Sequence, residues 1–261
     1  MKKTVLHVPL TLGSPKEHIH QICKWAKNNH SAYTCFANVH MIVEANSDDQ
    51  FLKVVQQADL VVTDGVPLTW LLNIEYGIKQ ERVAGMDLLP ELLKESASQH
   101  IPVYFFGGTE EMLVQTRAHL QENYPGLQIS GMYSPPFKPM NVEEEEKIIK
   151  TINASGAQLV IVVLGCPKQE KWMSAMKGKI FASMIGIGGA LPVMIGLQKR
   201  APLWMQNAGL EWLFRLYKEP VRLFKRYFVT NSLFIYMALK QCISNKFSKI
   251  NAVKELNKVS S

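Results

Sequence analysis

Over the first 198 residues, short apolar runs rich in β-branched residues alternate with amphipathic stretches of helical period. This alternation constrains the fold more than any other feature of the sequence. Short continuous apolar runs are typical of strands buried on both faces, and helices between them supply the crossovers of a parallel sheet. The sequence therefore predicts an α/β fold with a Rossmann-like, mostly parallel sheet covered by helices on both faces.

The alternation also predicts where the chain divides. Predicted strands occupy residues 4–10, 33–39, 59–63, 102–107, 127–133, 158–164 and 181–187. After residue 198 the pattern changes to two or three helices rich in Trp, Phe, Leu, Arg and Lys, with Pro220 as their one strong break. We therefore expect an α/β domain over residues 1–198 and a C-terminal helical appendage over residues 199–261.

Positive charge is concentrated in this appendage. Of the 29 Lys and Arg and the 22 Asp and Glu residues, 12 and 3 lie in residues 199–261, so the appendage carries +9 and the rest −2. Such a segment favours an anionic partner, either a phospholipid surface or nucleic acid. Its large aromatics and the lack of a nucleic-acid-reading motif favour helices lying in a membrane interface. A helical cap that packs on the sheet with solvated charges is the alternative.

Other features bear on the compartment. The four cysteines are scattered without metal-ligand spacing, which favours free thiols in a reducing cytoplasm. The N-terminal residues lack the sustained apolar stretch of a cleaved signal peptide. The most apolar part of the appendage, residues 228–239, is far shorter than the roughly 20 residues that a membrane span needs. We therefore expect a cytoplasmic protein that binds the membrane peripherally.

Polar residues follow two of the predicted strands, at the edge where doubly wound sheets bind their ligands. Asp64 follows the strand over 59–63, and Asn38 and His40 follow the strand before it. A partly desolvated carboxylate at this edge can act as a general base, whereas an N-cap of the next helix is the structural alternative for Asp64. For His40 alone, a hydrogen-bonded structural role is the simpler interpretation.

Two glycine-rich turns and one arginine are candidates for binding phosphate. Gly107 and Gly108 lead from a strand into a helix, whose backbone N–H groups and dipole favour anions. Gly188 lies in a second such turn, "GIGGALP". Neither turn matches a dinucleotide fingerprint or a P-loop. Arg82 has the charge to neutralise phosphate, with a surface salt bridge as the alternative.

A further polar group follows the run over residues 158–164. The chain leaves this strand through "LGCPKQE", which presents Lys168, Gln169 and Glu170 side by side. We expect Gln169, with Lys168 nearby, in a ligand pocket and Glu170 in a structural role. The chain has no Asp-x-Asp pair to hold a divalent ion. A leaving diphosphate would therefore rely on backbone amides and Arg or Lys.

In their order and spacing, these segments resemble the WecG/TagA/CpsF family of bacterial glycosyltransferases. The stretches that carry the resemblance are "FAN", "ADLVVTDGVPLTW", "RVAGMDLL", "VYFFGGTEEML", "LGCPKQEKWM", "GIGGALPVMIG" and "KRAPLWMQNAGLEWLFRLYKEPVRLFKRY". The resemblance implies transfer of N-acetylmannosamine or a related hexose from a UDP-sugar to an undecaprenyl-diphosphate-linked saccharide. It also implies inversion at the anomeric carbon, no required metal or cofactor, and work at the inner face of the cell membrane.

The resemblance also assigns roles. Asp64 matches the family's proposed base, Arg82 and Gln169 match positions of the diphosphate and sugar region, and Asn38 matches the asparagine after the second strand. Three arginines of the appendage would complete the site and contact the membrane: Arg215, Arg222 and Arg226. Their spacing puts them on one helical stripe if Pro220 does not break the register.

Some positions differ from the family pattern and leave the donor sugar open. N-acetylmannosaminyltransferases of the family commonly have a threonine where this chain has Phe36, and their "NPE" is here Asn38-Val39-His40. An acidic residue is often found where Pro192 stands. A non-catalytic nucleotide-binding protein of polysaccharide assembly is the alternative function, although it would not need a carboxylate at Asp64. Assembly with further copies of the chain is left open, and nucleic acid is not expected as a partner.

Overall fold

The structure is a computed structural model that describes residues 1–136, 138 and 140–259, with the backbone alone for residues 207 and 246–259. Within these residues, six strands form one sheet in the order β4-β3-β8-β7-β5-β6, and each neighbouring pair is parallel. The strands are β3 (Tyr33–Ala37), β4 (Leu60–Thr63), β5 (Val103–Gly107), β6 (Ile129–Tyr133), β7 (Leu159–Val163) and β8 (Ser183–Gly186). The predicted Rossmann-like α/β sheet is confirmed.

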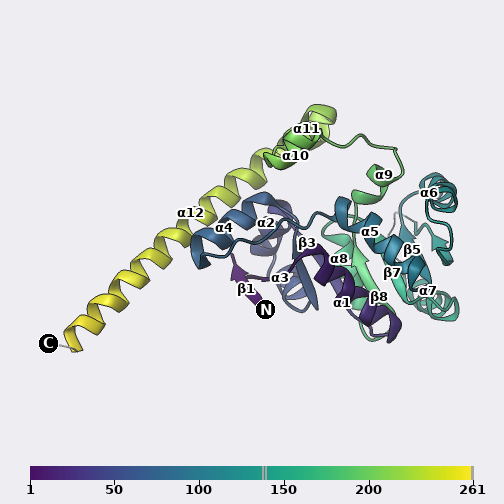
Figure 1. Cartoon of the computed structure of the whole chain (residues 1–261), viewed down its shortest axis with the longest axis horizontal. Helices are drawn as coiled ribbons and strands as arrows, with labels where there is room; N and C mark the ends of the chain where they lie inside the picture. The colour runs from purple at the N-terminus through teal and green to yellow at the C-terminus, as the bar shows by residue number, and fades with distance from the viewer. Residues whose placement is uncertain (137, 139, 260–261) are drawn as a thin grey trace.

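Helices cover both faces of this sheet (Figure 1). The core on one face is shared with α1 (Pro15–Lys27), α5 (Gly85–Ser98), α6 (Glu110–Asn123) and α9 (Ala190–Met194). The core on the other face is shared with α2 (Val39–Ser47), α3 (Asp49–Gln56), α4 (Val66–Tyr76), α7 (Val142–Ala154) and α8 (Lys168–Met176). Successive strand residues point to opposite faces, so Phe105 and Phe106 are both fully buried but belong to different cores.

The predicted strand over residues 4–10 is wrong. The chain here forms an antiparallel hairpin of β1 (Lys2–Val5) and β2 (Val8–Thr11), separate from the main sheet. Leu6 and His7 make the turn with φ angles of 47° and 65°, a region that non-glycine residues rarely enter. The turn is held from outside: the Asn46 amide donates to the Leu6 carbonyl, and the Leu6 N–H donates to the side chain of Gln241. Neither partner is apparent from the local sequence.

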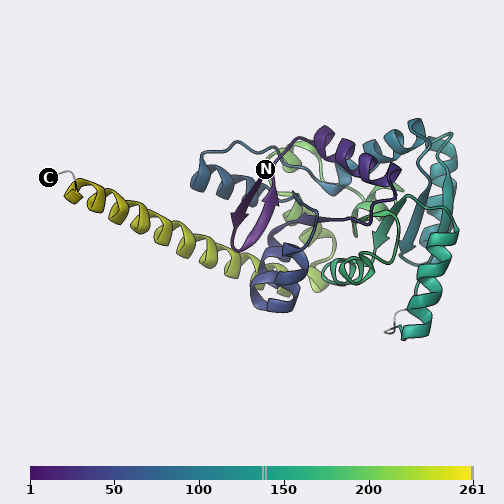
Figure 2. The ribbon, with the colours of Figure 1, turned by 90° about the horizontal axis from the view of Figure 1, so that it is seen from below.

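The segment after residue 198 forms three helices: α10 (Leu203–Asn207), α11 (Glu211–Lys218) and α12 (Pro220–Val259). Helix α12 runs along α2 and α4, and its C-terminal end projects well beyond the rest of the molecule (Figures 1 and 2). One face of α12 buries Leu223 and Phe234. Phe224 and Phe228, on another face, are exposed and stack on each other. The helix thus packs as a cap and also presents aromatic side chains to solvent.

The helices of the appendage bear on two expectations: the stripe of three arginines and the lack of a membrane span. Pro220 begins α12, and Glu219 before it has left the helical conformation, so the register from Arg215 to Arg222 is broken. The three arginines therefore do not form the single stripe that their spacing allowed. Among the described residues, no helix has a stretch apolar enough and long enough to cross a bilayer.

Candidate active site

Asp64 lies directly after β4, at the carboxyl edge of the sheet. Its backbone N–H donates to the carbonyl of Ala37 at the end of β3, at 2.9 Å, which fixes it beside the neighbouring strand. The N-cap of α4 is Gly65, and no side chain caps this helix. The interpretation of Asp64 as an N-cap is therefore wrong, and its carboxylate is not used for capping.

The surroundings of Asp64 make its carboxylate a stronger proton acceptor. Burial raises the pKa of Asp64 to about 6, with Arg82 and Arg215 opposing this shift and Glu211 and Asp87 adding to it. The side chain nevertheless keeps 24% of its surface exposed, so a ligand can reach it. A carboxylate whose pKa lies close to neutral pH is suited to take a proton from an alcohol in a transition state.

Arg82 connects Asp64 to the appendage. Its Nε donates to the backbone carbonyl of Asp64 at 2.8 Å, and its Nη2 lies 2.5 Å from the Glu211 carboxylate of α11. Nη2 also lies 3.9 Å from the carboxylate of Asp64. The salt bridge of Arg82 with Glu211 is thus mostly buried, whereas the sequence left a surface salt bridge as the alternative. Arg82 also lies next to the candidate base, Asp64.

The ion pairs extend from Glu211 to the segment before α10. Arg200 donates through Nε to Glu211 at 3.4 Å, and it forms a two-bond pair with Asp87 of α5 at 2.5 and 2.9 Å. Sequence reasoning missed all three of these residues. The available signal was that Glu211 is one of only three acidic residues in a segment with 12 basic ones.

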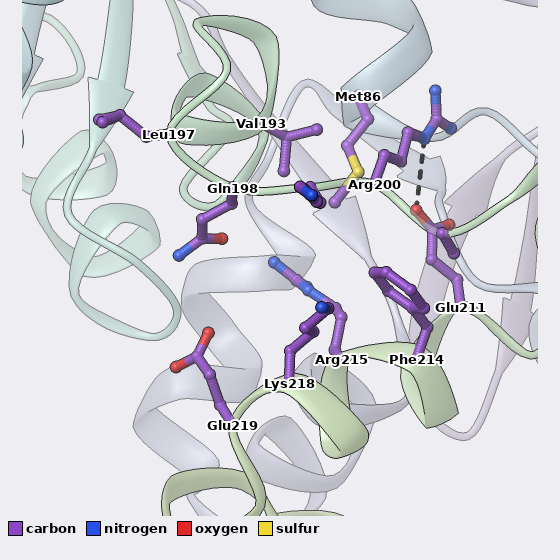
Figure 3. Close-up of a pocket in the computed structure, with 12 residues that line it drawn as sticks. Met86, Val193, Leu197, Gln198, Arg200, Glu211, Phe214, Arg215, Lys218 and Glu219 are labelled. Carbon is purple, nitrogen blue, oxygen red and sulfur yellow. Dashed lines mark hydrogen bonds and ion pairs between the residues drawn. The ribbon is translucent and has the colours of Figure 1, made fainter.

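A pocket of about 240 Å³ lies between α11 and the segment over residues 193–201 (Figure 3). Arg215 and Lys218 project into it from α11, and Lys199 lines it from the other side. Met86 and Phe214 supply apolar walls. Basic groups beside apolar walls suit an anionic ligand that also carries an apolar part.

Arg215 reaches the second glycine-rich turn. A Cβ atom on Gly189 would lie 2.6 Å from Nη2 of Arg215, so the guanidinium lies directly against this glycine and would have to shift for a larger residue. Arg215 makes no ion pair of its own with any described residue, while Arg82 and Arg200 are paired with carboxylates. Its charge is therefore available to an anion in the pocket.

The other two arginines lie elsewhere. Arg222 is exposed and pairs with Glu219 at 2.5 Å. Arg226 is close enough to His40 to lower the pKa of that imidazole, although burial is the larger cause. Of the three arginines chosen from the sequence, the structure brings Arg215 close to Asp64 and Arg226 close to His40.

Asn38 and His40 lie at the start of α2. The Asn38 side chain accepts from the N–H of Met41 at 3.1 Å and so caps this helix, which leaves its amide N–H₂ for other partners. His40 is partly buried between Glu44, 3.7 Å away, and the backbone of Cys166. His40 thus touches the turn that leaves β7, a contact that its place in the sequence did not show.

The "LGCPKQE" segment separates its three polar residues. Gln169 is buried: its amide nitrogen donates to the Gly186 carbonyl and to Glu170, and its oxygen accepts from the N–H of Gly165. Glu170 is fully buried, and burial raises its pKa to about 7. Lys168 is exposed at the first position of α8. Gln169 therefore joins the turns that follow β7 and β8.

The structure explains why glycines occupy positions 107 and 108. A Cβ atom on Gly107 would lie 2.5 Å from the Val163 carbonyl oxygen, and Gly107 has a φ of 112°. The N–H of Gly108 donates to that same carbonyl at 3.0 Å. This turn brings β5 and β7 together, and Thr109 caps the following helix by accepting from Met112. A Cβ atom on Gly188, which has a φ of 41°, would lie 3.3 Å from Oε1 of Gln169.

The described residues include no cluster of three or more His, Cys, Asp or Glu side chains that could hold a metal ion. The positively charged side chains near Asp64 are those of Arg82 and Arg215. A parallel α/β sheet with a carboxylate at a strand end and a basic pocket nearby is typical of enzymes that act on anionic substrates.

The comparison with known families agrees with this class. The sequence model of the glycosyl transferase WecG/TagA/CpsF family matches residues 3–248, nearly the whole chain. The chain therefore belongs to the WecG/TagA/CpsF family of glycosyltransferases, whose members act in cell-surface polysaccharide synthesis. Membership implies a nucleotide-sugar donor and a glycan acceptor.

Proposed function

We propose that this protein is an inverting glycosyltransferase that moves a hexose from a UDP-sugar to an undecaprenyl-diphosphate-linked saccharide. N-acetylmannosamine or a close relative is the proposed sugar. The observation that carries the proposal is the carboxylate of Asp64, which lies at the carboxyl edge of the sheet, free of helix capping and beside Arg82 and Arg215.

In the proposed reaction, Asp64 accepts the proton of the acceptor hydroxyl as its oxygen attacks the anomeric carbon. The bond between that carbon and the β-phosphate oxygen of UDP breaks, and UDP leaves with the bonding electrons. Attack from the face opposite to UDP inverts the anomeric configuration. A single direct displacement needs one carboxylate and no covalent enzyme intermediate, which agrees with one base at the site.

The negative charge that develops on the departing diphosphate must be stabilised. We propose that Arg215 does this, because its guanidinium makes no ion pair with a described residue and lies against the Gly189 turn. Lys199 and Lys218 add two further positive charges to the same pocket. Fixed cations in a partly desolvated site stabilise developing negative charge without a metal. We therefore propose metal-independent transfer, with Arg215 facing the leaving group.

The appendage fits an acceptor held in a membrane. We propose that residues 199–261 form a membrane-associating unit that works on the inner face of the cell membrane. Its charge of +9 and its exposed aromatic residues Phe224 and Phe228 support this role. The acceptor's diphosphate would then reach the pocket from the lipid surface.

The experiment is a transfer assay with the purified chain. A panel of UDP-sugars is offered with a lipid-diphosphate-linked acceptor, and the anomeric configuration of the product is read by NMR. We expect transfer from one hexose donor with inversion. Binding of UDP without transfer from any donor would favour a non-catalytic protein of polysaccharide assembly.

A further inference from the structure

Two carboxylates compete for one nitrogen of Arg82. Nη2 of Arg82 lies 2.5 Å from Oε2 of Glu211 and 3.9 Å from Oδ1 of Asp64. The bond from Nε to the backbone carbonyl of Asp64 keeps the guanidinium beside both carboxylates, so a small movement of Nη2 decides which of them it pairs with. In this arrangement the appendage's carboxylate holds the close ion pair, and the carboxylate of the candidate base is left at the longer distance.

Glu211 is held firmly in this position. Its side chain is only 12% exposed, and its second oxygen accepts from Arg200, which is anchored in turn to Asp87. Each of its oxygens is thus bonded to one guanidinium group, Oε2 to Arg82 and Oε1 to Arg200.

We propose that Glu211 is a positioning residue that keeps Arg82 off the Asp64 carboxylate, so that Asp64 stays able to accept the acceptor's proton. This role rests on the proposed function. Without the charge of Glu211, Nη2 of Arg82 is free to close the gap to Asp64 and form a direct pair. A direct Arg–Asp pair favours the charged carboxylate and weakens it as a proton acceptor.

In this arrangement the basicity of Asp64 depends on residues of the appendage. The charged groups that face Asp64 are Arg82 from the segment before α5, Asp87 from α5, and Glu211 and Arg215 from α11. Two of these four belong to the appendage. Displacement of α11 would remove a cation from the pocket, and it would also release Arg82 onto Asp64. The base is therefore fully active only when α11 is docked.

The test compares the full-length wild type with Glu211→Gln. The side-chain carboxyl of Asp64 is titrated by NMR on protein with ¹³C-labelled aspartate, with the signal assigned through Asp64→Asn. We expect Asp64 to titrate near 6 in the wild type. In Glu211→Gln we expect the pKa of Asp64 to fall by at least about one unit, because Asp64 loses the direct repulsion of Glu211 and also gains Arg82 as a close partner. Glu211→Asp, which keeps the charge, should restore most of the wild-type value.

The pH profile of kcat/KM is the second readout. In Glu211→Gln its acidic limb should move downward with the NMR titration, while turnover at the plateau falls about 3- to 10-fold because the base is weaker. Glu91→Gln, which breaks an exposed pair with Lys94, is the matched control and should change neither readout.

The results of these experiments test the role of Glu211 and the proposed function separately. An unchanged Asp64 titration in folded Glu211→Gln would overturn the role of Glu211, whatever its activity. A shifted titration in a protein that transfers no sugar would overturn the proposed function and leave the competition for Arg82 standing. If Glu211→Gln does not fold, equal titrations of Glu211→Asp and wild type support the proposal, and a downward shift in Glu211→Asp with normal turnover contradicts it.

Discussion

The side-chain amide of Gln169 donates to the backbone carbonyl of Gly186 at 2.9 Å, which joins the first turn of α8 to the end of β8. The same amide donates to Glu170, and its oxygen accepts from Gly165. All three bonds lie within the protein. We expect the main role of Gln169 to be holding together the turns that follow β7 and β8.

Loss of these bonds should lower stability. In Gln169→Ala the buried Gly186 carbonyl and the Glu170 carboxylate each lose a donor, so the free energy of unfolding should fall by about 1–3 kcal/mol. Urea unfolding measures this directly. The neighbouring Lys168→Ala removes an exposed side chain and should stay within about 0.5 kcal/mol of the wild type. Equal stability of the two variants would contradict the structural role of Gln169.

Glu170 should make stability depend on pH. Burial raises its pKa to about 7, above the ordinary value of 4.5. Between these two values the folded state holds a proton that the unfolded state has released, so the contribution of Glu170 to stability falls as pH rises through this window. The fall amounts to at most about 3 kcal/mol.

Glu170→Gln isolates this effect, because glutamine keeps the neutral form at every pH and still offers an oxygen to Gln169. We expect the stability difference between variant and wild type to grow in favour of the variant from pH 4.5 to 7 and then to level off. Urea unfolding over this series checks it. Parallel stability curves would show that Glu170 does not titrate there.

Chelation should leave activity intact. The described residues hold no cluster of metal ligands, and in the proposed reaction Arg215 meets the charge of the leaving diphosphate. We expect transfer in excess EDTA to match that of the untreated protein. Loss of activity that magnesium or manganese restores would mean that the leaving group is neutralised by an ion.

Membrane binding should depend on the aromatic residues of α12. Phe224 and Phe228 are 62% and 67% exposed and stack on one another. Burying each in a bilayer interface contributes about 1.5–3 kcal/mol, so replacing both by serine should weaken binding to phosphatidylglycerol vesicles at least about 10²-fold.

The control for this measurement is Phe181→Ser, since Phe181 is 59% exposed on the α/β body just before β8. Vesicle cosedimentation of the control should match the wild type. If both replacements change binding equally, or neither does, α12 is not the part that meets the membrane.

The sequence predicted the main sheet because its strands are continuous apolar runs, a signal that survives without tertiary context. It failed at Leu6 and His7, where bonds from Asn46 and Gln241 impose a turn on residues with no turn propensity. Asp64 was found because a carboxylate directly follows a buried strand. Glu211 was missed because its importance comes from Arg82, a residue 129 positions away.

The arginines of the appendage show the same limit. Their spacing was read as one helix, but Pro220 starts a new helix and sends Arg222 to solvent. Helical periodicity applies only within one helix, and the break between α11 and α12 was left as a condition. Arg215 lies against Gly189, a contact between distant segments that no local pattern reveals.

The most direct test of the account is the turnover of Asp64→Asn, measured together with its affinity for UDP. Asparagine keeps the size of the side chain but cannot accept the acceptor's proton, so kcat should fall at least about 10²-fold. The dissociation constant for UDP should stay within about threefold of the wild type, because the basic pocket is unchanged. Turnover close to that of the wild type, with UDP still bound, would contradict the assignment of Asp64 as the base.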